Sequence, residues 1–111
     1  MTFNTRQEGN ATVVTVGGRL DGVTSAIYEK NIRELIDGGA LSLVVDMEEL
    51  EYVSSAGIRG IMIMAKLIKE KNGQVCLANL KGNVRAVFNM CGITPLFKIE
   101  DSVAAALGTL K

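Results

Sequence analysis

The stretch EYVSSAGIRGIM, residues 51–62, holds the side chains whose types and spacing most suggest chemistry. Ser54 and Ser55 place two hydroxyl groups directly before an apolar run of helical spacing that starts at Ile58. A serine hydroxyl in this position serves as a nucleophile, as a helix cap or as the acceptor of a phosphate. The only acid in the stretch is Glu51, so a nucleophilic serine would need its base from another part of the chain.

The chain contains no histidine. This absence removes the commonest general base, the Ser-His and Cys-His nucleophile pairs and the commonest metal ligand. Lys66 and Lys69 lie more than two helical turns beyond the serines, so neither is a suitable replacement base. We therefore expect no catalytic residue, no metal and no cofactor, and a serine hydrolase built on Ser54 or Ser55 is disfavoured.

The composition is that of an ordinary globular domain. Of the 111 residues, 48% are hydrophobic and 22% are charged, which predicts a single domain over residues 1–111 with one hydrophobic core. The 12 basic and 12 acidic residues cancel, and only 5% of the residues are aromatic. Neither nucleic acid nor a membrane is therefore an expected partner.

The sequence also suggests a reduced, cytoplasmic protein. The first residues, MTFNTRQEGN, lack the basic and apolar regions of a signal peptide. The apolar run 58–68 is interrupted by Arg59 and Lys66 and is too short to span a bilayer. Cys76 and Cys91 lie far apart in apolar patterns and match no metal-ligand spacing, so we expect two reduced thiols in the core.

Hydrophobic periodicity divides the chain into alternating strands and helices. A strand is predicted at 11–16, paired with residues 1–8 through a turn at Gly9-Asn10. A helix should begin at Thr24 or Ser25 and end at Gly38-Gly39. The remaining segments read as a strand at 40–47, a loop at 48–53, a helix that Asn72-Gly73 ends, a strand at 74–79, a helix at 84–91, a strand at 96–100 and a helix from 101 or 102 onward.

This alternation predicts an α/β domain with a mixed, mostly parallel sheet of about four or five strands and about four helices. Binding surfaces in such folds lie beyond the carboxyl ends of the strands, where Asp21, Asp46 and the two serines are expected to gather. Both aspartates also have a plain structural explanation, Asp21 as part of an Asp-Gly turn and Asp46 as a cap of its strand end.

The simplest role of the two serines is to cap the helix that follows, by accepting a hydrogen bond from an N–H of its first turn. Gly57 costs about 1 kcal/mol in helix propensity relative to alanine, and we interpret it as leaving backbone N–H groups open to an approaching group. A helix N-terminus also favours an anion. A phosphate on Ser55 would be tolerated there and would add about −1.5 to −2 charges to a neutral protein.

Three motifs together cover nearly the whole chain: GGRLDGVTSAIYEKNI, LVVDMEELEYVSSAGIRGIM and GQVCLANLKGNVRAVFNMCGITPLFKIEDSVAAAL. In this order they resemble the STAS domain family, typified by bacterial anti-sigma factor antagonists. The second motif is fairly specific, because a strand-ending aspartate is followed by a serine-serine-alanine-glycine loop. Asp21 matches the aspartate of the family's first motif, and Asp46 matches the strand-ending one.

The resemblance implies a partner switch. In that family an ATP-using anti-sigma kinase phosphorylates a serine of this loop. The unphosphorylated protein binds the kinase and releases a sigma factor, and phosphorylation ends this binding. Alignment on Gly57 puts the phosphorylated serine at Ser55, with Ser54 as the second choice; the family's best-known members often carry aspartate at the position of Ser54. The partner-binding residues implied are Asp21, Ser54, Ser55, Gly57 and Arg59, although a solvated helix arginine is the plainer interpretation of the last.

Two other interpretations are weighed against the switch. A receiver domain would be phosphorylated on Asp46, but the strand at 11–16 offers no acidic residues to hold Mg²⁺. A STAS domain without a switch, acting as a scaffold in a signalling complex or as a subunit of a lipid or anion transport system, would share the same fold. The sequence separates this scaffold poorly from the switch.

Overall fold

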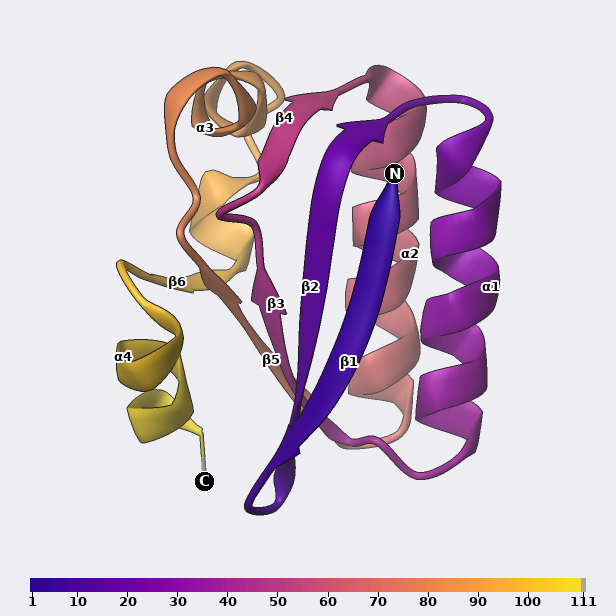
Figure 1. Ribbon diagram of the computed structural model, residues 1–111, viewed down its shortest axis with the longest axis vertical. Coiled ribbons are helices and arrows are strands. Elements are labelled where there is room, and N and C mark those ends of the chain that lie inside the picture. Colours follow the sequence, from indigo (N-terminus) through magenta and orange to yellow (C-terminus); the bar gives the residue numbers. More distant parts are fainter. Residues whose placement is uncertain (111) are drawn as a thin grey trace.

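The structure is a computed structural model that describes residues 1–110 (Figure 1). Within this range the chain forms six β-strands, four α-helices and one short 3-10 helix. Their bounds are β1 Thr2–Glu8, β2 Ala11–Leu20, α1 Thr24–Asp37, β3 Ser42–Asp46, β4 Leu50–Val53, α2 Ser55–Glu70, β5 Gln74–Ala78, α3 Gly82–Met90, the 3-10 helix Thr94–Leu96, β6 Lys98–Glu100 and α4 Val103–Thr109. The α/β class and the order of helices and strands follow the sequence prediction.

The strands form one mixed sheet in the order β1-β2-β3-β5-β6, and β4 pairs with the far end of β2. The β1–β2 hairpin is antiparallel, as predicted, and turns at Gly9 with a φ of 62°. The four other pairings are parallel. The prediction of a mostly parallel sheet is therefore confirmed, with one strand more than the largest number expected.

Helices cover both faces of this sheet (Figure 1). On one face α1 and α2 enclose the main core, in which Val14 and Val45 of the strands meet Tyr28, Ile32 and Ile61 of the helices. On the other face α4 packs on a smaller cluster, with Ala106 against Val13, Val44, Cys76 and Ala78. Because side chains alternate along a strand, neighbouring residues of β2 and β3 serve the two cores in turn.

Three local predictions need correction. β2 continues past Gly17-Gly18 to Leu20, and the loop expected at 48–53 contains the strand β4. The expectation of two core thiols is wrong for Cys91, which is exposed because α3 ends at Met90; Cys76 is buried, and both are free. None of the helices within residues 1–110 is long and apolar enough to cross a membrane.

Tyr28 anchors the packing of α1 on α2 and offers a test of the main core. Its ring is 1% exposed and lies edge-on to Phe3, with centroids 6.0 Å apart, while its hydroxyl donates a hydrogen bond to Met64 Sδ at 3.0 Å. A thioether sulfur is a weak acceptor. Burial raises the pKa of this phenol far above its ordinary value of 10.0.

We therefore expect Tyr28→Phe to change the free energy of unfolding by less than about 1 kcal/mol, since the ring contacts stay and only a weak hydrogen bond is lost. Tyr28→Ala should lower it by about 3–5 kcal/mol through the cavity that it leaves. Urea unfolding followed by circular dichroism measures both. A loss above about 2 kcal/mol for the phenylalanine variant would contradict this account and assign the stabilisation to the hydroxyl.

Candidate functional site

The candidate site lies where β2 and β4 end side by side, at the upper end of the sheet in Figure 1. The parallel register pairs Arg19 with Tyr52 and Leu20 with Val53. The backbone N–H of Ser54 then donates a hydrogen bond to the carbonyl of Leu20 at 2.9 Å. This register makes Ser54 the neighbour of the chain segment that leaves β2, and Asp21 is the next residue of that segment.

Ser54 is the cap of α2. Its backbone is extended, with φ −92° and ψ 175°, and its side-chain Oγ accepts a hydrogen bond from the N–H of Gly57 at 3.2 Å. Its carbonyl accepts the next N–H, that of Ile58, at 2.9 Å. The half-buried hydroxyl of Ser54 is thus engaged in holding the first turn of the helix.

Ser55 is the first residue of α2 and differs from its neighbour in every one of these respects. It is exposed, and its hydroxyl forms no hydrogen bond with any other residue from 1 to 110. The first turn of α2 carries no acidic side chain, so the positive end of the helix dipole is not neutralised there. Arg59 lies one turn further along, exposed and without an ion pair among residues 1–110.

Gly57 is required by close packing and not by access. A Cβ at this position would lie 2.5 Å from the carbonyl oxygen of Leu20 and 2.7 Å from Cγ2 of Val53. The interpretation that Gly57 leaves N–H groups open to a ligand is wrong, because the residue is buried and its own N–H is bound to Ser54. Gly57 instead lets the start of α2 rest directly on the ends of β2 and β4.

Asp21 caps the other helix of the site. Its Oδ1 accepts hydrogen bonds from the N–H groups of Val23 and Thr24, each at 3.1 Å, and the Thr24 hydroxyl accepts one from the N–H of Asp21 at 2.8 Å. This reciprocal arrangement resembles a capping box. The Thr24 N–H is the main cause of a lowered pKa for the Asp21 carboxyl, and the Thr24 hydroxyl, the Val23 N–H and nearby Arg19 add to the effect.

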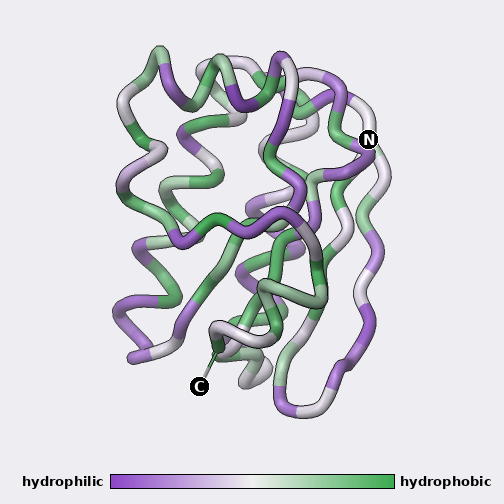
Figure 2. Tube along the Cα trace, turned by 90° about the vertical axis from the view of Figure 1, so that its left-hand side faces the viewer, coloured by the Kyte–Doolittle hydropathy of each residue, from purple (hydrophilic) through white to green (hydrophobic). Residues whose placement is uncertain are grey.

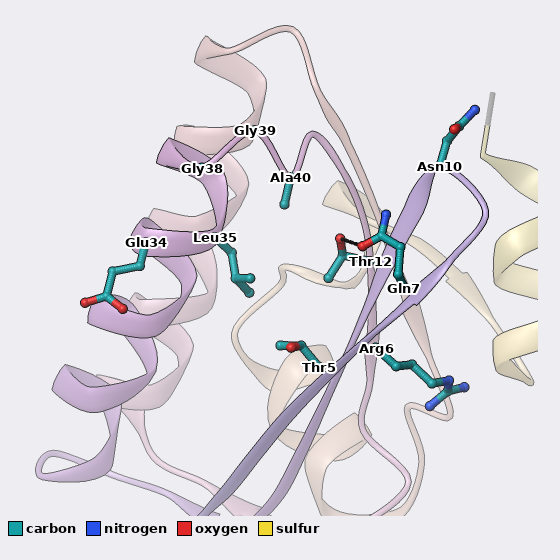
Figure 3. Close-up of a pocket in the computed structure, with 10 residues that line it drawn as sticks. All are labelled: Thr5, Arg6, Gln7, Asn10, Thr12, Glu34, Leu35, Gly38, Gly39 and Ala40. Atoms are coloured by element: carbon teal, nitrogen blue, oxygen red, sulfur yellow. Dashed lines mark hydrogen bonds between the residues drawn. The ribbon is translucent and has the colours of Figure 1, made fainter.

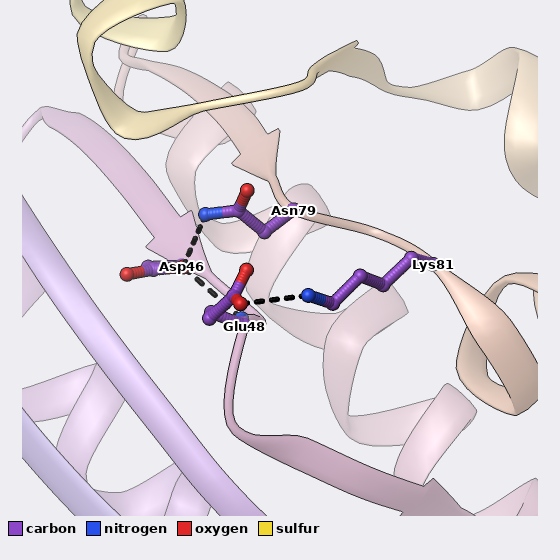
Figure 4. Close-up of polar contacts among 4 residues, drawn as sticks. All are labelled: Asp46, Glu48, Asn79 and Lys81. Atoms are coloured by element: carbon purple, nitrogen blue, oxygen red, sulfur yellow. Dashed lines mark hydrogen bonds and ion pairs between the residues drawn. The ribbon is translucent and has the colours of Figure 1, made fainter.

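Asp46 is not part of this group, so the expectation that it gathers with the serines is wrong. It ends β3 beside Thr15 and Ala78, and the missed strand β4 carries the chain onward before the serines are reached. Figure 4 shows its Oδ1 accepting hydrogen bonds from the N–H of Glu48 at 3.1 Å and from Asn79 Nδ2 at 2.9 Å. These bonds tie the turn after β3 to the turn after β5, as does the ion pair of Lys81 and Glu48 at 2.7 Å.

Sequence reasoning missed the apolar part of the surface beside the serines. The Arg19 guanidinium lies over the ring of Tyr52, with 4.1 Å from Cζ to the ring centroid, and Tyr52 is 39% exposed. Val23, next to the Asp21 turn, is 77% exposed. The sequence did offer a signal for Val23, because this apolar residue directly follows the Asp21-Gly22 pair and lies outside the apolar stripe of the predicted helix. The position of Tyr52 depends on β4, which was not predicted.

These features define a class before any comparison: a small α/β protein in which an exposed serine, with no side chain hydrogen-bonded to it within residues 1–110, opens the second helix at one end of the sheet. The sequence matches the STAS domain model over residues 2–106. The chain therefore belongs to the STAS domain family.

Several relatives bear names from bacterial regulation. BtrV of Bordetella bronchiseptica, provisionally named an anti-sigma factor antagonist, is 29% identical over 89% of this chain and 85% of its own length. An anti-sigma factor antagonist from Mycobacterium paratuberculosis superposes with a TM-score of 0.89 at 20% identity, over 98% of this chain and 92% of that one. The phosphorylated form of the Bacillus cell fate determinant SpoIIAA gives a TM-score of 0.72 at 21% identity, over 94% and 96% of the two chains. The two structural likenesses show the fold.

Gly57 and Gly60 provide a matched pair that tests the packing of the site. Alanine at either position gains up to about 1 kcal/mol in helix propensity. At Gly60 the new Cβ would find its nearest atom at 3.6 Å, which is ordinary contact, whereas at Gly57 it would meet backbone at 2.5 Å. We expect Gly57→Ala to lower the free energy of unfolding by about 1–3 kcal/mol and Gly60→Ala to leave it unchanged or raised. Equal results for both in thermal or urea unfolding would refute the close contact.

The Asp21 cap predicts a pH dependence of stability. Because the folded protein lowers the pKa of this carboxyl, the ionised form adds stability above the unfolded pKa of about 3.9, and this contribution disappears as pH falls through the lower folded pKa. Asp21→Asn keeps an acceptor of the same shape but no charge. We expect the variant to be less stable than the parent at pH 7, with the difference shrinking below about pH 4. Urea unfolding at pH 7 and pH 3 measures it, and a constant difference would contradict the charge effect.

Proposed function

We propose that this protein is an anti-sigma factor antagonist that binds an anti-sigma factor kinase when unphosphorylated, thereby frees a sigma factor, and is switched off by phosphorylation of Ser55. The names of the sequence relatives support the antagonist role. The kinase and the switch are inferred from the loop itself and from its resemblance to the family's motif.

One observation carries the choice of Ser55. The two adjacent hydroxyls occupy different environments: that of Ser54 is half-buried and bound to the Gly57 N–H, whereas that of Ser55 is exposed and without a hydrogen bond to any residue in the described range. A kinase must reach the hydroxyl and place it in line with the ATP γ-phosphate. Ser55 allows this without loss of any side-chain hydrogen bond within residues 1–110.

The phosphate would act on the surface and leave the fold intact. It would sit at the N-terminus of a 16-residue helix, which favours an anion by about 0.3–1 kcal/mol at an exposed site, and Arg59 is spaced one turn away to share its charge. The same phosphate adds about −1.5 to −2 charges to a surface that already carries Asp21. A kinase surface shaped for the neutral hydroxyl would then meet an excess of negative charge.

The contact surface that we propose combines Asp21, Ser54, Ser55 and Arg59 with the exposed apolar side chains of Val23 and Tyr52. Gly57 contributes by positioning the serines and not by contact. An apolar centre with charged residues around it is the usual composition of a protein–protein interface. The domain would supply binding energy and a phosphate acceptor, while the chemistry belongs to the kinase.

The test is phosphorylation by the host's anti-sigma kinases with ATP, followed by tandem mass spectrometry and by binding measurements. We expect one phosphate, on Ser55, in both the parent and Ser54→Ala, and none in Ser55→Ala. Ser55→Ala should keep binding the kinase in the presence of ATP, and Ser55→Asp should bind about tenfold or more weakly because of like-charge repulsion.

Ser54→Ala is the matched control, because it removes a hydroxyl of the same loop at a cost of about 1 kcal/mol of helix capping and leaves the acceptor in place. A phosphate on Ser54 alone would overturn the assignment of the acceptor. A protein that no kinase modifies, and that co-purifies stably with a membrane or signalling complex whatever the state of Ser55, would instead be the non-switching scaffold.

A further inference from the structure

The two faces of the sheet are covered unequally. On one face α1 has four buried residues and α2 has six, whereas α4 on the other face has only Ala106. Within residues 1–110 no other helix contributes to the apolar cluster on the α4 side. Figure 2 views the molecule from this side, and Figure 1 shows α4 at the margin opposite to α1. The docking of α4 therefore depends on a small set of contacts.

The helix α4 is too short to be stable by itself. Its seven residues, VAAALGT, are well below the roughly 12–15 that an isolated helix needs to be even marginally stable in water. It contains no charged side chain, and neither ion pair within residues 1–110 involves it. The apolar residues Val103, Leu107 and Leu110 are only half-buried. Packing against the sheet must therefore stabilise α4, and that packing is limited.

A hollow at the end of α4 shows that the packing is incomplete. It has a volume of about 170 Å³, and its lining includes Leu107 and Leu110 at the end of α4 and Ala11 and Ser42 of the sheet. A larger hollow, of about 570 Å³, lies between β1 and the end of α1 (Figure 3). The last turn of α1 is nevertheless anchored by Ile36, which is 3% exposed. In contrast, α4 has no large side chain that is buried to this degree.

The surface beneath α4 is a short apolar row. The parallel register places Val13 beside Val44 and Val44 beside Cys76, on three neighbouring strands, and all three side chains are fully buried. The next row on this face is partly polar, because Asp46 is in register with Ala78. Removal of α4 would thus expose one narrow row of small apolar side chains and leave the main core, between the sheet and α1 and α2, intact.

The strand that precedes α4 is anchored independently of it. β6 is paired with β5 over all three of its residues, and the Glu100 carbonyl at its end accepts a hydrogen bond from the N–H of Asn79 at 3.1 Å. Ser102 belongs to the helix, because its Oγ accepts the Ala105 N–H at 3.0 Å. Asp101, between the strand and this cap, is exposed. A change of backbone angles at Asp101 would therefore move α4 as a unit without disturbing the sheet.

We propose that α4 is a detachable cover of the sheet. It turns away at Asp101 while the strands and the other three α-helices stay folded, and this local opening uncovers the row formed by Val13, Val44 and Cys76. Segments with few buried contacts open in this way at a much smaller free energy than global unfolding. The opened domain presents an apolar surface on the face opposite to α1 and α2. This device is distinct from the proposed switch, because it involves neither the serine loop nor a kinase.

Cys76 and Cys91 form a pair of reporters for this opening. Both are free; Cys91 is exposed, whereas Cys76 lies buried in the α4 cluster. Burial raises the pKa of the Cys76 thiol, and a hydrogen bond with Thr109 of α4 only partly offsets the effect, so Cys76 becomes reactive when α4 opens. With the full chain and excess dithiobisnitrobenzoate at about pH 8, one thiol should react at once and the second slowly. Peptide mass spectrometry should assign them to Cys91 and Cys76.

Two exposed positions of α4 allow its stability to be changed without altering its contacts with the sheet. Gly108→Ala adds a Cβ that meets nothing within 4 Å and should slow the labelling of Cys76 by up to about fivefold through helix propensity. Ala105→Gly, at an exposed residue, should accelerate it by up to the same factor. The rate of Cys91 should not change in either variant.

Gly57→Ala is the matched control, because it is expected to destabilise the whole domain from the face opposite to α4. It should leave the Cys76 rate unchanged if α4 opens locally. A Cys76 rate that rises by the full factor of this variant's measured loss of stability would assign the labelling to global unfolding and overturn the proposal. A rate that neither α4 substitution alters would also overturn it. Urea unfolding verifies that all three variants are folded.

Discussion

The contact between the end of β2 and the start of α2 is the constraint on which the rest of the site depends. The carbonyl of Leu20 accepts the Ser54 N–H at 2.9 Å, and the same oxygen would lie 2.5 Å from any Cβ at position 57. The helix can rest this close to the strand end only where residue 57 has no side chain. Its low helix propensity is therefore offset by a packing arrangement that alanine cannot reproduce.

That close contact also separates the roles of the two serines. The residue hydrogen-bonded to Leu20 must be extended, and an extended residue directly before a helix is in the position of the cap, so Ser54 takes this role. The next residue is already helical and faces outward. A phosphate on Ser54 would compete with the hydrogen bond that orders the first turn, whereas one on Ser55 would disturb no side-chain hydrogen bond within residues 1–110. The order of the two hydroxyls thus favours the outer one as an acceptor.

Much of the fold was predictable because strong local patterns coincide with long elements. The apolar spacing of α2 and the branched runs of β3 and β5 gave their positions within a few residues. β4 was missed because its four residues, LEYV, include a charged side chain and an exposed tyrosine, and its pairing with β2 is a long-range feature that no local pattern marks. The Gly17-Gly18 pair indicated an end to β2, but it accommodates a register shift near Gly18, where φ is 80°.

The missed strand explains which parts of the site could be predicted. Ser54, Ser55 and Asp21 were predicted to lie at one end of the sheet because each comes shortly before a predicted helix, and the β2–β4 pairing does bring the ends of the two preceding strands together. The same reasoning was wrong for Asp46, because β4 lies between Asp46 and the serines in the chain. The Asp46 carboxylate instead connects two turns through its hydrogen bonds with Glu48 and Asn79.

The surfaces at the two ends of α1 also differ in a way that depends on the fold. At its start, the Asp21 cap and the serine loop form a surface whose charge a phosphate would change. At its end, the last turn carries no basic residue, and Glu34 forms no ion pair within residues 1–110. The net charge of zero gave no indication of this difference in charge between the two ends of α1, because the difference depends on which residues the fold places at each end.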